Sequence, residues 1–164
     1  MKIFDTSSII CFLREIEFPK ALDTCIEHGY RLIITQQVYD EIQKNPDTLM
    51  AFTVYGKFSI IPVNDTPCFE KLAKRYPWLH KGEISVLCLG LQKEREHLRY
   101  ICIIDERARN LKDRLHLRIH GSLGLLLWQK QCRDLTRDEC HDLYKRVKES
   151  SFRIPEDILA ELIR

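Results

Sequence analysis

The sequence lacks the features of several protein classes. No two of its seven cysteines form a C-x-x-C pair, which argues against a zinc ribbon or a disulfide framework. No segment approaches the roughly 18 apolar residues that a membrane-spanning helix needs. Residues 1–5 (MKIFD) leave no room for the apolar region of a signal peptide. We therefore expect a soluble, cytoplasmic protein without a membrane segment.

Low-complexity segments, internal repeats and obvious linkers are also missing, and there are only six glycines and six prolines. The 164 residues are 45% hydrophobic and 30% charged, a balance typical of an ordered globular chain. A chain of this length can bury roughly two-thirds of its unfolded surface. We therefore expect one domain over residues 1–164.

The charges are unevenly distributed along the chain. Residues 93–148 hold 14 Lys and Arg against 9 Asp and Glu, whereas the remainder holds 12 against 15. A basic segment beside an acidic remainder suits a polyanionic ligand held near a cation site. Charged helices that solvate their outer faces would explain the same numbers, so the distribution alone decides nothing.

Short apolar runs rich in β-branched residues alternate with segments of helical periodicity. This alternation indicates an α/β fold with a mainly parallel sheet. The expected strands are 2–5, 31–34, 59–63, 100–104 and 117–119. The expected helices are a short one after the first strand, which Ser7 or Ser8 can cap, and then 19–28, 36–44, 68–76, 83–91, 106–115, 123–131, 136–149 and 155–162. Residues 48–55 show no clear pattern.

Two aspartates follow apolar strands at the point where a helix begins. Asp5 ends the first expected strand, and Asp105 ends the clearest buried one. Ligand sites in open parallel sheets form beyond the carboxyl ends of the strands. If these two strands are neighbours, two anions lie within a few ångströms of each other. That arrangement costs free energy unless protons or a cation offset the repulsion.

Two glutamates occupy helices in suggestive positions. Glu41 lies near the apolar positions of its helix, and Glu83 falls in the first turn of the next long one, where the helix dipole favours a carboxylate. With the two aspartates they form an all-oxygen ligand set suited to Mg²⁺ or Mn²⁺ rather than zinc. Each acid also has a plainer interpretation. Either aspartate can cap a helix, Glu41 can be solvated, and Glu83 can serve the helix dipole alone.

Taken in order, these acidic segments resemble the motifs of PIN-domain proteins, with the prokaryotic VapC-like branch as the closest match. The matching segments are Ile3-Phe4-Asp5-Thr6-Ser7-Ser8, Val38-Tyr39-Asp40-Glu41-Ile42, Gly82-Glu83, Ile103-Ile104-Asp105-Glu106-Arg107-Ala108-Arg109 and Gly121-Ser122-Leu123-Gly124. The resemblance spans almost the whole chain. Each motif is short, so the specificity of the resemblance lies in the order and spacing of the motifs.

The resemblance implies a three-layer α/β/α sandwich with a central, mainly parallel sheet. It implies a ribonuclease that hydrolyses RNA phosphodiester bonds with Mg²⁺ or Mn²⁺, and it makes Asp5, Glu41, Glu83 and Asp105 the catalytic, metal-binding acids. One departure is visible. Close relatives often carry two consecutive aspartates where this chain has Asp105-Glu106. If the second acid also binds metal, the longer Glu106 side chain shifts or weakens the outer metal site.

Five further residues are candidates for contacts with substrate. Hydroxyls and guanidinium groups near the acids can orient water or grip phosphates; the candidates are Thr6, Ser7, Arg107, Arg109 and Ser122. The hydroxyl residues could instead cap helices. The arginines could instead pair with Glu106 and Asp113 on a solvated surface.

The resemblance also implies partners. Toxins of this family are neutralised by a small antitoxin protein, often through an arginine placed among the acids. We also expect a homodimer, with apolar residues of the C-terminal helices as a candidate surface, although such residues commonly complete a core. These residues are Leu143, Val147, Ile158, Leu159 and Leu162.

The sequence leaves two other functions to compare with a nuclease. A phosphatase with an aspartyl nucleophile needs a second acid two residues after the strand-end aspartate, and here that position is Ser7. A second alternative is a catalytically weak PIN-fold module that binds RNA or a protein without cleavage. Asp5→Asn separates this alternative from a nuclease, because it should abolish cleavage while leaving pure binding nearly unchanged.

Overall fold

The computed structural model describes residues 1–152 and 154–164, apart from the side chains of residues 106 and 107. Its centre is a five-stranded sheet in the order β3-β2-β1-β4-β5, with each pair of neighbours parallel. The strands are β1 (Lys2–Phe4), β2 (Leu32–Thr35), β3 (Ser59–Ile61), β4 (Ile101–Ile103) and β5 (Ile119–His120). β1 and β2 are buried along their whole length, as parallel strands covered on both faces require.

The sheet has a topological switch point beside β1. From β1 the chain proceeds outward through β2 to β3, and it then returns to the other side of β1 to add β4 and β5. β1 and β4 pair in register, with Phe4 opposite Ile103. A crevice forms beyond the carboxyl ends of strands at such a point, because the two connections leave in opposite directions.

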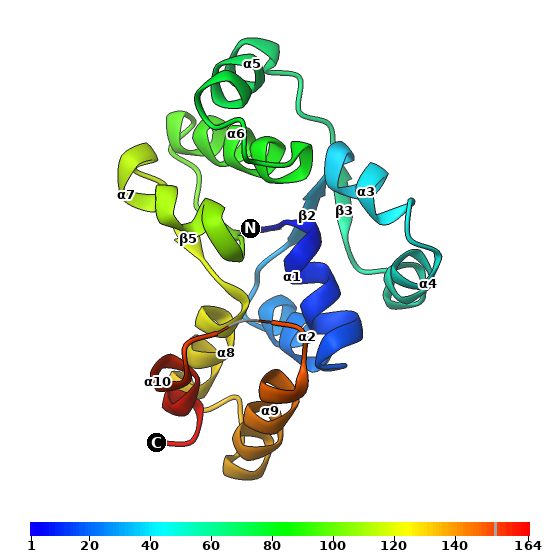
Figure 1. Cartoon of the computed structure of the whole chain (residues 1–164), viewed down its shortest axis with the longest axis vertical. Helices are drawn as coiled ribbons and strands as arrows, with labels where there is room; N and C mark the ends of the chain where they lie inside the picture. The colour runs from blue at the N-terminus through cyan, green and yellow to red at the C-terminus, as the bar shows by residue number, and fades with distance from the viewer. Residues whose placement is uncertain (153) are drawn as a thin grey trace.

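Helices cover both faces of the sheet. α6 packs on one face against β1, β2 and β4, with α5 outside it, while α2 contacts β2 and α8 contacts β5 below (Figure 1). The predicted three-layer α/β/α fold with a central parallel sheet is thus confirmed. The helical elements are α1 (Thr6–Ile10), η1 (Cys11–Glu15), α2 (Lys20–Glu27), α3 (Gln36–Ile42), α4 (Pro46–Tyr55), α5 (Thr66–Arg75), α6 (Lys81–Arg95), η2 (Glu106–Leu111), α7 (Lys112–Leu115), α8 (Ser122–Gln131), α9 (Arg137–Glu149), α10 (Glu156–Leu159) and η3 (Ala160–Leu162).

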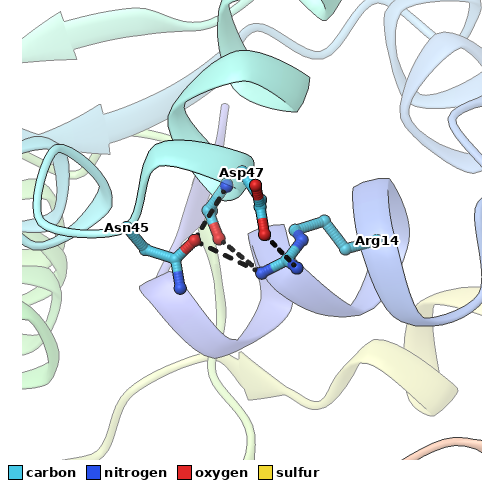
Figure 2. A network of polar contacts seen from close by, with 4 residues as sticks. Arg14, Asn45 and Asp47 are labelled. Carbon is cyan, nitrogen blue, oxygen red and sulfur yellow. Dashed lines mark hydrogen bonds and ion pairs between the residues drawn. The ribbon is translucent and has the colours of Figure 1, made fainter.

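Helix α4 fills the stretch to which the sequence assigned no element. Met50 and Val54 are 65% and 83% exposed, so the apolar residues of α4 do not mark one buried face. Polar contacts define its start instead. The Asn45 side chain accepts a hydrogen bond from the Thr48 amide, and Figure 2 shows Arg14 of η1 reaching Asn45 and Asp47. One local hydrogen bond and the contacts with Arg14 therefore fix the start of this helix.

The C-terminal elements complete the core. Leu143 and Val147 of α9, with Leu159 and Leu162, are at most 3% exposed, and only Ile158 of the five expected interface residues is substantially exposed, at 40%. Four of these residues therefore serve the single chain, and the homodimer remains a prediction. Among the described residues, no helix combines the length and apolarity needed to cross a bilayer.

Candidate active site

Asp5 lies at the carboxyl end of β1 and is 1% exposed. Its Oδ1 accepts hydrogen bonds from the Ser8 amide (2.8 Å) and the Ser8 hydroxyl (2.5 Å). The carboxylate therefore caps α1. The capping role and a place at the switch point are compatible, because the carboxylate stays at the end of the strand.

Asp105 follows β4 and approaches Asp5 from the neighbouring strand. Its carboxylate makes no capping bond to η2 but accepts hydrogen bonds from the Ser122 amide (2.8 Å) and the Ser122 hydroxyl. Its Oδ2 also lies 3.3 Å from the Ser8 hydroxyl oxygen. Since Ser8 touches both carboxylates, Asp5 Oδ1 and Asp105 Oδ2 are less than about 6 Å apart.

The Ser8 hydroxyl cannot satisfy both acids at once. Its oxygen lies within hydrogen-bonding distance of Asp5, Asp105 and the Ile103 carbonyl, yet a hydroxyl carries one proton to donate. Burial raises the pKa of Asp5 well above its usual value, and the charge of Asp105 adds to this rise. Burial also raises the pKa of Asp105, against the opposing hydrogen bonds from Ser122. The pair therefore favours a bound proton or cation.

Glu41, on α3, lies near the end of β1, where its carboxylate contacts the residue after Asp5. Its Oε2 accepts a hydrogen bond from the Thr6 hydroxyl, and its Oε1 accepts one from the Gly82 amide at 2.8 Å. A Cβ at Gly82 would overlap the Glu41 carboxylate, with Cδ at 2.9 Å. The absence of a side chain at Gly82 is what allows the carboxylate to reach the backbone of α6.

A buried hydroxyl chain fixes α6 against α3. Thr35 Oγ1 and Ser85 Oγ lie 2.6 Å apart, and Ser85 donates to the Gly82 carbonyl at 2.6 Å. Thr35 also caps α3. These hydrogen bonds hold the start of α6 where the Gly82 amide meets Glu41.

Glu83 belongs to the first turn of α6. Its Oε2 accepts a hydrogen bond from the His80 amide at 2.8 Å, as half of a capping box. Its charge contributes to the raised pKa of Asp5. A cavity of about 330 Å³ brings three of the acids together, and its lining residues are Asp5, Thr6, Ser7, Glu41, Lys44, His80 and Glu83.

A larger groove of about 820 Å³ adjoins this cavity, and Ser7 lines both. Asp105 and Arg109 contribute to the groove beside Gly121. A Cβ at Gly121 would lie 2.9 Å from Asp105 Oδ1 and 3.0 Å from Arg109 Nη1. Arg109 therefore lies close to Asp105, and its positive charge opposes part of the rise in the Asp105 pKa.

The structure brings the four predicted acids to one end of the sheet. Asp5 and Asp105 meet through Ser8, while Asp5, Glu41 and Glu83 share the cavity. The individual roles of these acids remain predictions.

The other predicted residues occupy different places. Thr6 holds Glu41, and Ser7 lies between cavity and groove. Ser122 is 1% exposed and holds the Asp105 carboxylate from within the fold. The expectations for Glu106 and Arg107 concern side chains outside the described part of the structure.

Three supporting residues were missed from the sequence. Ser8 joins the two aspartates, and Gly82 and Gly121 each leave room for a carboxylate. The sequence offered one usable signal, since Ser8 is three residues after Asp5, the spacing at which a capping carboxylate meets a backbone amide. Nothing local indicated which carboxylate would approach either glycine.

The whole sequence matches a known protein family. The model of a family described as a PIN domain matches residues 1–164. The chain belongs to the PIN-domain family. PIN domains are generally nucleases that use divalent metal ions, and the fold of this chain is of that nuclease type. No curated protein and no solved structure matches the chain.

The residues of this PIN domain fit a hard divalent ion. Among the side chains that the structure describes, which leave out those of residues 106, 107 and 153, no three His, Cys, Asp or Glu residues are already gathered as a metal site. Mg²⁺ rarely requires such a cage, because it commonly binds through one or two carboxylates, with waters and substrate phosphates as its other ligands. Asp5 and Asp105 offer that pair, with raised pKa values that a cation would offset.

Proposed function

We propose that this PIN domain is an endoribonuclease that hydrolyses RNA phosphodiester bonds with Mg²⁺ or Mn²⁺. One observation supports the proposal above all others. Two buried aspartates share a single hydroxyl at the switch point of the sheet, next to a cavity that holds two more acids. Burying like charges together is unfavourable unless a cation joins them, and the all-oxygen donor set suits these ions.

The residues divide the work as follows. Asp5 and Asp105 would hold the ion directly, in orientations set by Ser8 and Ser122. Glu41, held by Thr6 and Gly82, would accept hydrogen bonds from water in the cavity. When bound, the ion lowers the pKa of a coordinated water and stabilises charge on the phosphate.

Two basic side chains are placed to receive the phosphate backbone. Arg109 lines the groove beside Asp105, and Lys44 lines the cavity beside Glu41. Both are exposed. Each can contact phosphate oxygens and position the strand without reading its bases.

The proposal is tested by cleavage of a labelled single-stranded RNA with Mg²⁺, with Mn²⁺ and with chelator. We expect cleavage with either ion and none with chelator. Asp5→Asn should lower kcat by at least about a hundredfold, the scale of removing one charge-stabilising group from an active site. Asp40→Asn is the matched control, because Asp40 is an exposed neighbour of Glu41 that bonds to Gln36.

The alternative, a PIN-fold module that only binds RNA, predicts a different result. Such a module would show no metal-dependent cleavage, and Asp5→Asn would bind RNA as well as the wild type or better. Cleavage that persists in chelator, or that Asp5→Asn leaves unchanged, would contradict the proposed mechanism.

We further propose that the protein acts as the toxin of a toxin–antitoxin pair. The acid cavity would accept a basic side chain from a small inhibitory protein, because three carboxylates line it. Induced expression in a bacterial host tests this role. Growth should stop with the wild type and continue with Asp5→Asn, and continued growth with both would contradict it.

A further inference from the structure

Trp78 is a large aromatic side chain that the proposed site does not use. It lies in the loop between α5 and α6 and is 41% exposed. Tyr76, which is 4% exposed, supports it through an edge contact, with ring centroids 5.9 Å apart. The indole is thus held in place while much of its surface remains in water.

Trp78 lines a shallow depression that also has polar and charged walls. The other lining residues are Asn110, Leu111 and Arg114, and the volume is about 400 Å³. Leu111 is buried, whereas Asn110 and Arg114 are exposed. An indole face, an amide and a guanidinium group are the three groups with which proteins stack a nucleobase, bond its edge and hold its phosphate.

The depression shares one lining residue with the groove that contains Asp105. Asn110 also lines the groove that contains Asp105 and Arg109. Along the chain, Trp78 is two residues from His80, which lines the acid cavity. A nucleic-acid strand lying across Asp105 would therefore meet Asn110 and then Trp78.

We infer that Trp78, Asn110 and Arg114 form a subsite for an unpaired nucleotide of single-stranded RNA, flanking the bond that is cut. The inference rests on the proposed nuclease function. The base stacks on Trp78 and Arg114 contacts the adjacent phosphate. Stacking accepts any base, since each base has a π-face, so the subsite selects single-stranded substrate rather than one sequence.

The chain offers a direct optical test, because its only other tryptophan is Trp128. Trp128 lies in α8 and packs against His28 and Tyr30. In a Trp128→Phe variant that also carries Asp5→Asn to prevent cleavage, all tryptophan fluorescence comes from Trp78. We expect a single-stranded RNA of about ten nucleotides to quench it and a duplex of the same sequence to quench far less. The matched control is Trp78→Phe, whose remaining Trp128 should not respond.

Kinetics provide a second measurement that a merely structural role would not reproduce. In the otherwise wild-type chain, Trp78→Leu should raise KM for this RNA by roughly five- to a hundredfold and leave kcat within about twofold. Arg114 is exposed, and Arg114→Ala should weaken RNA binding. It should also reduce the slope of log K against log salt concentration by the amount expected for about one phosphate contact.

The outcomes separate the two proposals. Quenching by single-stranded RNA without any RNA cleavage would support the subsite and reject the nuclease. Cleavage without quenching, with an unchanged KM for Trp78→Leu, would reject the subsite and leave the nuclease standing. Equal quenching by duplex RNA would reject the preference for an unpaired nucleotide.

Discussion

The short strand β1 carries a buried positive charge at one end and a buried negative charge just beyond the other. Lys2 is 2% exposed, and its Nζ lies 4.3 Å from the centre of the Tyr30 ring and 4.2 Å from that of Trp128. Asp5 is 1% exposed, and the second buried aspartate, Asp105, lies next to it. Aromatic rings lie against the buried ammonium group of Lys2, whereas a second carboxylate lies beside the buried carboxylate of Asp5.

The difference indicates which of the two charges is structural. Burial lowers the pKa of Lys2, but two aromatic faces attract its ammonium group and offset part of that cost. Asp5 instead faces a like charge, and the hydroxyl of Ser8 has one proton for both acids. The charge of Arg99 adds to the lowering of the Lys2 pKa, and the two aromatic rings of the chain itself are what offset it. For Asp5 the offsetting positive charge would come from an added cation. The comparison can be tested by perturbing each end separately.

The largest expected effect is stabilisation by metal. Mn²⁺ or Mg²⁺ at a hundred times its Kd should stabilise the fold by about 2.7 kcal/mol. For a chain of this size that is a rise in Tm of roughly 5–10 °C. Asp5→Asn and Asp105→Asn should lose most of the rise, because each removes one of the two carboxylates. Thermal unfolding followed by circular dichroism, with metal or with chelator, measures the effect.

Two controls accompany this measurement. In chelator, Asp5→Asn should be at least as stable as the wild type, because it removes one of two neighbouring like charges. Lys2→Met should retain the full metal response, since Lys2 lies at the opposite end of the strand. A rise in Tm of the same size in both aspartate variants would show that the ion binds elsewhere.

The next effect concerns the other end of β1. Lys2→Ala should lower the free energy of unfolding by about 2 kcal/mol, because it removes the ammonium–aromatic contacts and the packed alkyl chain. Lys2→Met keeps the chain and removes the buried charge, so its cost should be less than about 1 kcal/mol. Urea unfolding of both variants gives the values. A change in RNA cleavage per folded molecule in either variant would break the distinction between the two ends.

Much of the fold could be predicted because its signals are local. The apolar runs before Asp5 and Asp105 identified β1 and β4 and placed each acid at a strand end. Helix α4 escaped prediction, since Met50 and Val54 lie in solvent and blur its periodicity. That β1 and β4 are neighbours follows from the order of the sheet, which no short segment of sequence determines.

The parts of the site that could not be predicted depend on contacts between residues far apart in the sequence. Gly82 matters because Glu41, 41 residues earlier, reaches its amide. Lys2 looked like a polar residue at the start of a strand, and only the packing of Trp128 showed that it is buried. Trp78 gave no signal, because a lone aromatic in a loop is common in chains of any function.

Glu41 lies between the two extremes of the comparison, and the smallest expected effect tests it. Its carboxylate has hydrogen-bond donors within the chain, from Thr6 and Gly82, yet it also faces the acid cavity. Alanine is favoured over glycine in helices by up to about 1 kcal/mol. At Gly82 an added methyl group would displace the Glu41 carboxylate, which is the end of a flexible side chain. Gly82→Ala should therefore leave stability within about 0.5 kcal/mol of the wild type, because the lost hydrogen bond cancels the helical gain.

In a Glu41→Ala background the displacement is absent, and Gly82→Ala should then stabilise by about 0.5–1 kcal/mol. If Glu41 acts in the cavity, Gly82→Ala in the wild-type background should also slow RNA cleavage while the fold is kept. A double-mutant cycle, with stability and RNA cleavage measured on all four proteins, separates the contribution of Glu41 to stability from its contribution to cleavage. An unchanged cleavage rate in the Gly82→Ala protein, with the cycle energy present, would place Glu41 with Lys2 among the structural charges.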